Sequence, residues 1–318
     1  MEKQPAIEIS GLVKSYGDQK ALNGINFTVN KGEILGFLGP NGAGKSTTMN
    51  ILTGYLAADA GTVKINGISI FDEPRETKKM IGYLPEIPPL YTDMTVLEYL
   101  RFVFDLKMVK ANRDTHLTQV MKCVKILDVQ KRLIKNLSKG YRQRVGFAQA
   151  LVGNPEILIL DEPTVGLDPN QIMEMRALIR ALGKAHTIIL STHILGEVSA
   201  VCDRYIIINH GTLAAEGNLH DLDAGAGQAG ISLRVKGTQE EITQALAAGN
   251  LDNSIQFLGS FEDGTEDFII CQKEDDIREK LFTLFSDRRL PILSMSAKTS
   301  SLEELFIKAT GQPEVNNQ

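Results

Sequence analysis

The sequence has few of the features that mark membrane-spanning, secreted or nucleic-acid-binding proteins. No run approaches the ~20 consecutive apolar residues that a spanning helix needs, and residues 1–10 lack the apolar segment of a secretory signal. There are 34 Lys and Arg against 39 Asp and Glu, a formal net charge of -5, which argues against a dedicated nucleic-acid binder. We therefore expect a cytoplasmic protein with no nucleic-acid partner.

Cysteine is also scarce. The three cysteines, Cys123, Cys202 and Cys271, lie far apart and have no Cys or His at metal-ligand spacing. This pattern predicts free thiols in a reducing compartment rather than disulfides or a zinc site. The 318 residues, 43% of them hydrophobic, allow one large and one small domain, or two of similar size, with a full core.

Residues 1–222 alternate short apolar runs with helix-like runs. Compact apolar strands are predicted at 33–38, 156–160 and 187–190, and a helix is predicted to begin near Ser46. Strands that are apolar on both faces are typical of a parallel sheet covered by helices. The pattern predicts an α/β domain over residues 1–222.

The character of the chain changes after residue 222. Residues 223–230, DAGAGQAG, predict a flexible linker. Residues 231–318 then predict strands at 231–235, 254–260, 267–271 and 292–296 and helices at 239–248, 275–285 and 301–309. This order predicts a small accessory α+β domain of ferredoxin-like type. It could regulate, dimerise or bind a partner, and its apolar positions favour a core over a docking face.

A glycine-rich loop between a predicted strand and a predicted helix fits the pattern G-x-x-x-x-G-K-[ST]. It comprises Gly39, Pro40, Asn41, Gly42, Ala43, Gly44, Lys45, Ser46 and Thr47. Such loops wrap phosphate oxygens with backbone N–H groups at a helix N-terminus. Lys45 is expected to neutralise the β- and γ-phosphates and Ser46 to ligate Mg²⁺. The loop alone predicts nucleotide binding and leaves the class of protein open.

Two adjacent carboxylates, Asp161 and Glu162, end the apolar run at 157–160. Neighbouring side chains on a strand diverge, so the two can have different roles. Asp161 is expected to support Mg²⁺, and Glu162 to polarise the attacking water as general base. A simple polar strand terminus is the alternative, and the phosphate loop makes it the less favoured one.

Three further motifs indicate a family. They are residues 137–143, LSKGYRQ, residues 166–168, GLD, and residues 191–193, STH. With the phosphate loop and the carboxylates, their order over residues 7–221 resembles ABC-type ATPases. The resemblance implies a P-loop NTPase core with a helical subdomain, a signature motif at 137–143, a D-loop aspartate at Asp168 and a catalytic switch histidine at His193. It also implies that Tyr16 stacks on adenine.

Each of these residues has an ordinary structural alternative. Tyr16 could be a partly buried strand aromatic and His193 a hydrogen-bonded structural histidine, while Ser138 with Gly140 could simply start a helix. The family mechanism uses them together. It implies a head-to-tail dimer, with ATP and Mg²⁺ as ligands, in which Ser138 and Gly140 of one subunit contact the γ-phosphate held by the other.

The sequence departs from the family pattern at two motifs. Glu86 stands where most members have a glutamine; it could ligate Mg²⁺, but the sensing role of that glutamine does not transfer simply. In the signature motif Lys139 replaces a glycine and Tyr141 replaces the glutamine. Ser138 and Gly140 are kept, so we expect activity to survive.

The variants at 82–86, 137–143, 167–171 and 301–306 resemble ATP-binding subunits of ABC-2-type exporters, most closely those associated with gliding motility. This implies an ATPase on the cytoplasmic face of the membrane that powers a separate multi-span permease. The main alternative is a soluble ABC ATPase acting in translation or DNA repair without a permease. An importer subunit and a P-loop kinase or GTPase are less favoured alternatives.

Overall fold

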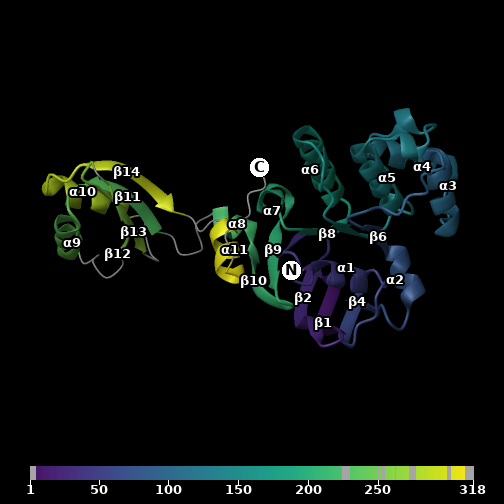
Figure 1. Ribbon diagram of the computed structural model, residues 1–318, viewed down its shortest axis with the longest axis horizontal. Coiled ribbons are helices and arrows are strands. Elements are labelled where there is room, and N and C mark those ends of the chain that lie inside the picture. Colours follow the sequence, from purple (N-terminus) through teal and green to yellow (C-terminus); the bar gives the residue numbers. More distant parts are fainter. Residues whose placement is uncertain are drawn as a thin grey trace. The chain divides into compact units, whose positions relative to one another are not determined.

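The computed structural model describes residues 5–223, 230–249, 251, 255–261, 263–271, 277–298 and 302–311 (Figure 1). These residues form two compact units. The larger contains the described residues up to Leu219 together with those from Phe306, and the smaller runs from His220 to Leu305. Among the described residues, no helix combines the length and the apolar character needed to cross a membrane.

A six-stranded sheet forms the centre of the larger unit, in the order β10-β9-β3-β8-β7-β6. Its strands are β3 (Ile34–Leu38), β6 (Ile81–Leu84), β7 (Ile157–Asp161), β8 (Thr187–Thr192), β9 (Arg204–Asn209) and β10 (Thr212–Asn218). All neighbours pair in parallel except β9 and β10. Every residue of β3, β7 and β8 is buried, as expected for a parallel sheet covered on both faces.

The two faces of this sheet belong to two different cores, because successive side chains of a strand point to opposite faces. Leu158 and Leu160 of β7 pack into one cluster, whereas Ile157 and Ile159 pack into the other. A continuous apolar run therefore serves both cores, which is why the strand shows no alternation of polar and apolar residues.

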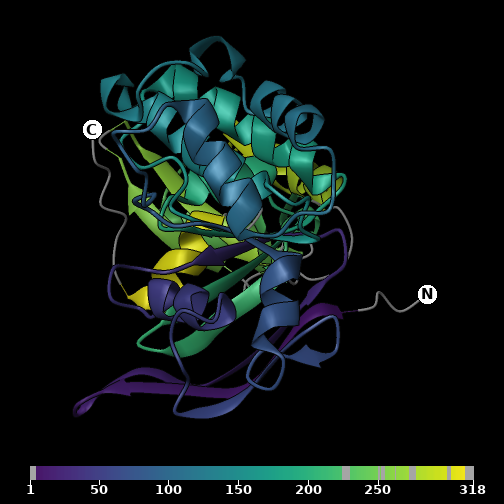
Figure 2. The ribbon, with the colours of Figure 1, turned by 90° about the vertical axis from the view of Figure 1, so that its right-hand side faces the viewer.

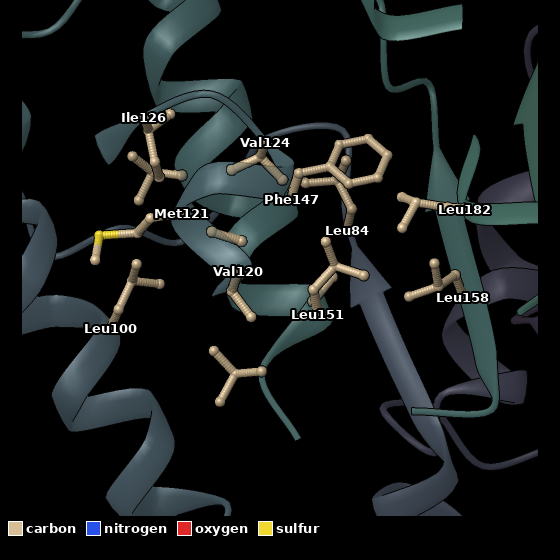
Figure 3. Packing of buried hydrophobic residues seen from close by; sticks show 14 of the residues in the cluster. Leu84, Leu100, Val120, Met121, Val124, Ile126, Phe147, Leu151, Leu158 and Leu182 are labelled. Carbon is tan, nitrogen blue, oxygen red and sulfur yellow. The ribbon is translucent and has the colours of Figure 1, made fainter. Parts of the chain in front are cut away.

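Helices cover the face that carries Leu158. They are α3 (Val96–Leu106), α4 (Arg113–Cys123), α5 (Lys139–Leu151) and α6 (Pro169–Gly183), with 3-10 turns η1 (Leu127–Val129) and η2 (Ile134–Asn136). Figure 3 shows side chains of α3, α4 and α5, among them Leu100, Val120 and Phe147, converging with Leu84 and Leu158 of the sheet. The helices α3, α4 and α5, between β6 and β7, are where the helical subdomain implied by the family resemblance would lie.

The opposite face carries α1 (Lys45–Leu52) and a second sheet. That sheet is antiparallel, in the order β2-β1-β4-β5, and comprises β1 (Pro5–Tyr16), β2 (Gln19–Asn30), β4 (Ala60–Ile65) and β5 (Ile68–Ser69). Figures 1 and 2 show α1 and these strands on one side and α3 to α5 on the other. The remaining helices are α2 (Pro74–Met80), α7 (Leu195–Val201) and α8 (Leu219–Asp223). The strand predictions did not include this second sheet.

The smaller unit contains a four-stranded antiparallel sheet in the order β12-β13-β11-β14. Its elements are β11 (Gly230–Lys236), α9 (Gln239–Ala248), β12 (Ile255–Ser260), β13 (Thr265–Cys271), α10 (Arg278–Asp287) and β14 (Ile292–Lys298). Leu281 and Phe285 of α10 are fully buried in the cluster that includes Phe268 of β13. The βαββαβ order and this strand order are those of a split βαβ arrangement.

The observed units differ from the predicted ranges at both ends. The smaller unit begins at His220, and the C-terminal part of α11 (Leu302–Thr310) belongs to the larger unit, where Asn209 Nδ2 donates to Ala309 O at 3.2 Å. The predicted accessory range 231–318 had included this helix. Most of the predicted linker 223–230 lies outside the described residues. The part of the predicted accessory range beyond Gly311 also lies outside them.

We predict that Phe147→Ala destabilises the larger unit by about 3–5 kcal/mol, because it leaves a cavity where the ring is fully buried. Urea-induced unfolding monitored by circular dichroism measures the change. The matched control is Tyr55→Ala, since Tyr55 is 84% exposed and its removal should change stability by less than about 0.5 kcal/mol. Equal effects of the two substitutions would contradict the packing described.

Candidate functional site

The loop from Gly39 to Lys45 joins the end of β3 to the start of α1. Gly42 and Gly44 have φ angles of 79° and 112°, values that non-glycine residues rarely adopt. A Cβ on Gly39 would lie 2.4 Å from Ile208 O, so only glycine fits there. No side chain of the described chain caps the N-terminus of α1. The N–H groups of its first turn therefore stay available for an anion such as phosphate.

Lys45 is buried inside this loop, with 6% exposure. Its Nζ donates to Gly39 O at 2.7 Å and to Pro40 O at 3.3 Å, and lies 3.8 Å from Glu162 Oε1. Burial lowers the pKa of Lys45, and the nearby carboxylates, Glu162 foremost, oppose that shift. An ammonium held in a loop by two carbonyl oxygens is placed to exchange them for stronger phosphate acceptors.

Asp161 and Glu162 lie at the carboxyl end of β7, and both are buried, at 4% and 7% exposure. Burial is the main cause that raises the pKa of Asp161, and the charge of Glu162 adds to it. Glu162 has a φ of 47°, so the extended conformation of β7 ends at Asp161 and the chain turns at Glu162. Its N–H donates to Ser191 O at 2.9 Å, which fixes this turn against β8.

His193 follows β8 directly and meets Glu162. Its Nδ1 lies 2.8 Å from Glu162 Oε1, while its side chain stays 41% exposed. The structure thus brings together three predicted site residues from three strand ends, Lys45 after β3, Glu162 after β7 and His193 after β8. Glu162 is the common neighbour of the other two.

A buried carboxyl group that the sequence predictions missed contacts residues close to Glu162 and His193 in the chain. Glu197 of α7 is 1% exposed and accepts hydrogen bonds from the hydroxyls of Thr164 and Thr192. The only sequence signal was a glutamate four residues after His193, inside a short apolar helix. That signal is weak, because a glutamate in an amphipathic helix ordinarily lies on the solvent-exposed face.

The residues predicted to hold Mg²⁺ provide oxygen ligands of the right kind. Asp161 Oδ1 and Ser191 Oγ are buried and lack a partner in hydrogen-bonding geometry among the described residues, although the Ser191 and Ser46 hydroxyls are near enough to oppose the raised pKa of Asp161. Glu86, exposed after β6, also acts on Asp161 through its charge. An unpartnered carboxylate oxygen beside hydroxyls fits Mg²⁺.

No group of three or more His, Cys, Asp or Glu among the described residues is arranged as a metal cage. Mg²⁺ does not require one. It commonly takes one or two protein carboxylates and completes its shell with phosphate oxygens and water. The donors around Asp161 therefore suit a metal that arrives with a nucleotide.

Three predicted residues lie apart from the phosphate loop's own contacts. Ser138 caps α5 by accepting from Tyr141 N, and a Cβ on Gly140 would meet the Gln171 side chain of α6. Tyr16, at the end of β1, is 52% exposed, with Lys14 Nζ 5.9 Å from its ring centroid. Tyr16 and Ser138 are exposed whereas Gly140 is buried, and their predicted roles stay predictions.

Comparison with known proteins identifies the family. Residues 22–165 match the family described as "ABC transporter". The chain is 33% identical over 96% of its length, and 97% of the relative's, to the bacitracin transport ATP-binding protein BcrA of Bacillus licheniformis. It belongs to the ABC transporter ATP-binding proteins. It is also 32% identical, over 98% of this chain and 95% of the relative, to the daunorubicin/doxorubicin resistance ATP-binding protein DrrA of Streptomyces peucetius.

A solved structure supports the same assignment for the larger unit. A dimeric post-hydrolysis state of the ATP-binding cassette MJ0796 with ADP and Pi superposes with a TM-score of 0.62 at 26% identity, over 67% of this chain and 98% of that one. The ABC ATPase fold, ATP binding and ATP hydrolysis coupled to transport, predicted from the sequence, are thereby confirmed. This chain is an ATP-binding subunit of the ABC-2 and drug-exporter type.

We predict that Lys45→Met weakens ATP binding by about tenfold to 100-fold, because a charge-assisted contact contributes roughly 1.5–3 kcal/mol. Isothermal titration with ATP and Mg²⁺ measures the loss. Lys79→Met is the matched control, since the Lys79 side chain is 57% exposed on α2. The affinity of this variant for ATP should equal that of the wild type. Unchanged affinity in Lys45→Met would remove this lysine from the phosphate site.

Proposed function

We propose that this ATPase subunit powers a separate multi-span membrane permease that works as an exporter, and that it operates on the cytoplasmic face of the membrane. The observation that carries the proposal is the joint arrangement of Lys45, Glu162 and His193 in a chain whose relatives along nearly its full length are transport and resistance ATP-binding proteins. The cargo would be selected by the permease.

Two copies of the chain would act together. The N-terminus of α5, with Ser138 and Gly140, would face the γ-phosphate held by Lys45 of the second copy. Support comes from the exposed position of Ser138 at the start of α5, and from the dimeric cassette structure that resembles 67% of this chain. A helix N-terminus attracts phosphate, so ATP would join the two subunits as an intermolecular ligand.

Within each site the catalytic residues have separate roles. Glu162 would accept a proton from the attacking water, and His193, 2.8 Å from Glu162, would hold that carboxylate and contact the γ-phosphate. Lys45 would neutralise the β- and γ-phosphates, and Tyr16 would stack on adenine. Hydrolysis then removes the phosphate that links the subunits, and the dimer opens. Catalysis of this kind depends on positioning and charge stabilisation.

Mg²⁺ would be held by Ser46 and Asp161, with Glu86 beside them, and would neutralise charge on the phosphates when bound. The carboxylate at Glu86 adds a negative charge near Asp161 and Lys45 where most family members have a neutral glutamine. A lineage associated with gliding motility stays a prediction from the sequence.

We predict that Glu162→Gln retains ATP and traps the dimer, while turnover falls by about 10²-fold or more, since a general base contributes roughly that factor. Steady-state phosphate release gives turnover, and size-exclusion chromatography with light scattering, with and without ATP, gives the oligomeric state. Glu33→Gln, at a buried carboxylate at the other end of β3, is the control. Wild-type turnover in Glu162→Gln would remove Glu162 from this role.

We also predict that the tagged chain, purified from gently solubilised membranes of its own cells, brings with it a stoichiometric multi-span membrane protein. Mass spectrometry identifies the partner. Recovery of ribosomes or DNA factors instead would favour an ABC ATPase that acts without a permease. Recovery of the chain alone from the soluble fraction would contradict the permease assignment in the same way.

A further inference from the structure

Glu197 is a buried titratable group for which the proposed chemistry has no role. It is 1% exposed in the first turn of α7. An ionised carboxylate that is buried needs hydrogen bonds and opposite charge to offset its desolvation. Burial raises the pKa of Glu197, and the hydroxyls of Thr164 and Thr192, followed by the charge of Arg176, oppose that shift. Glu162 is the nearby like charge.

The two hydrogen-bond donors of Glu197 come from two different elements, the loop after β7 and the last residue of β8. Thr164 lies two residues after Glu162, and Thr192 lies one residue before His193. Thr164 Oγ1 donates to Glu197 Oε1, and Thr192 Oγ1 donates to Glu197 Oε2 at 2.9 Å. One carboxylate therefore connects the loop that carries the general base with the end of the strand that the histidine follows.

The connection reaches the catalytic carboxylate through the backbone. Val165 N donates to Glu162 O and Leu167 N donates to Thr164 O, so Thr164 is part of the same tight turn as Glu162. Glu162 holds a φ of 47°, a conformation that costs free energy in a non-glycine residue and persists only where the surroundings fix it. An anchored Thr164 is one of those constraints.

The Thr192 hydroxyl has a single proton and two carboxylates within reach. Its oxygen lies 2.9 Å from Glu197 Oε2 and 3.3 Å from Glu162 Oε2, and it accepts from Ile194 N at 3.1 Å. The Thr192 hydroxyl therefore contacts the catalytic carboxylate directly, and its shorter hydrogen bond goes to Glu197.

We propose that Glu197 is a positioning residue for ATP hydrolysis. By accepting from Thr164 and Thr192 it fixes the Glu162 turn against the end of β8, directly before His193. The proposal rests on the role of Glu162 as general base. It assigns no contact between Glu197 and the nucleotide.

The test compares Glu197→Gln, Thr164→Val and Thr164→Ser with the wild-type full chain. We expect Glu197→Gln and Thr164→Val to lower kcat by at least about tenfold, as misplacement of a catalytic group does, with KM for ATP within about threefold of wild type. Thr164→Ser keeps the hydroxyl and should retain wild-type kcat. Glu33→Gln is the matched control, because Glu33 is a buried carboxylate bonded to Arg204 and Asn30.

The double variant Glu197→Gln/Thr164→Val separates positioning from general loss of stability. If the two residues act through one connection, the double variant loses no more kcat than Glu197→Gln alone, because residues that share an interaction are not additive. Multiplied losses, or a kcat that follows the melting temperature across all variants including Glu33→Gln, would overturn the proposal. If Glu197→Gln does not fold, the Thr164→Ser and Thr164→Val pair decides: equal kcat in the two overturns it.

Glu162→Gln, measured in parallel, distinguishes the two levels of the argument. Wild-type turnover in Glu162→Gln would refute the general base. Lost turnover in Glu162→Gln, together with wild-type kcat in Glu197→Gln and Thr164→Val, would overturn only the positioning role of Glu197.

Discussion

The parallel register of three strands is the constraint on which the site depends. Leu38 pairs with Thr192 and Asp161 pairs with Ser191, so β3, β7 and β8 end at one edge of the sheet. Lys45, Glu162 and His193 follow those ends and meet within hydrogen-bonding or ion-pair distance. A slip of one residue would turn Asp161 and its neighbours to the other face, and the two-sided apolar cores resist that slip because both faces are specified.

The charges at this edge are unbalanced in a way that suits a metal–nucleotide complex. One buried ammonium, Lys45, lies among Asp161, Glu162 and Glu86, which all act on it. Burial, and then the charge of Glu162, raise the pKa of Asp161. A divalent cation would supply the missing positive charge, and the phosphates would replace the carboxylates as the partners of Lys45. The site is therefore complementary to the complex rather than to either component.

Local sequence patterns predicted the elements that have strong local signals. The glycine-rich loop, the apolar runs of β3, β7 and β8 and the helix Gln239–Ala248 appear within a few residues of their predicted ranges. The long strands β1 and β2 were not predicted, because their polar residues on the solvent face dilute the apolar pattern. The contacts of Glu197 were not predictable either, since Thr164 and Thr192 approach it only after β7 and β8 pair.

Close packing around two glycines joins β6, and the segment that follows it, to α5. A Cβ on Gly82 of β6 would lie 2.3 Å from Ala150 O, and one on Gly146 of α5 would lie 2.6 Å from Pro88. The segment that carries Glu86 thus approaches α5 closely at Gly82, before Glu86, and at Pro88, after it. Interiors packed this tightly transmit displacement rather than absorb it. The backbone on either side of Glu86 is thereby held close to α5, the helix that Ser138 caps.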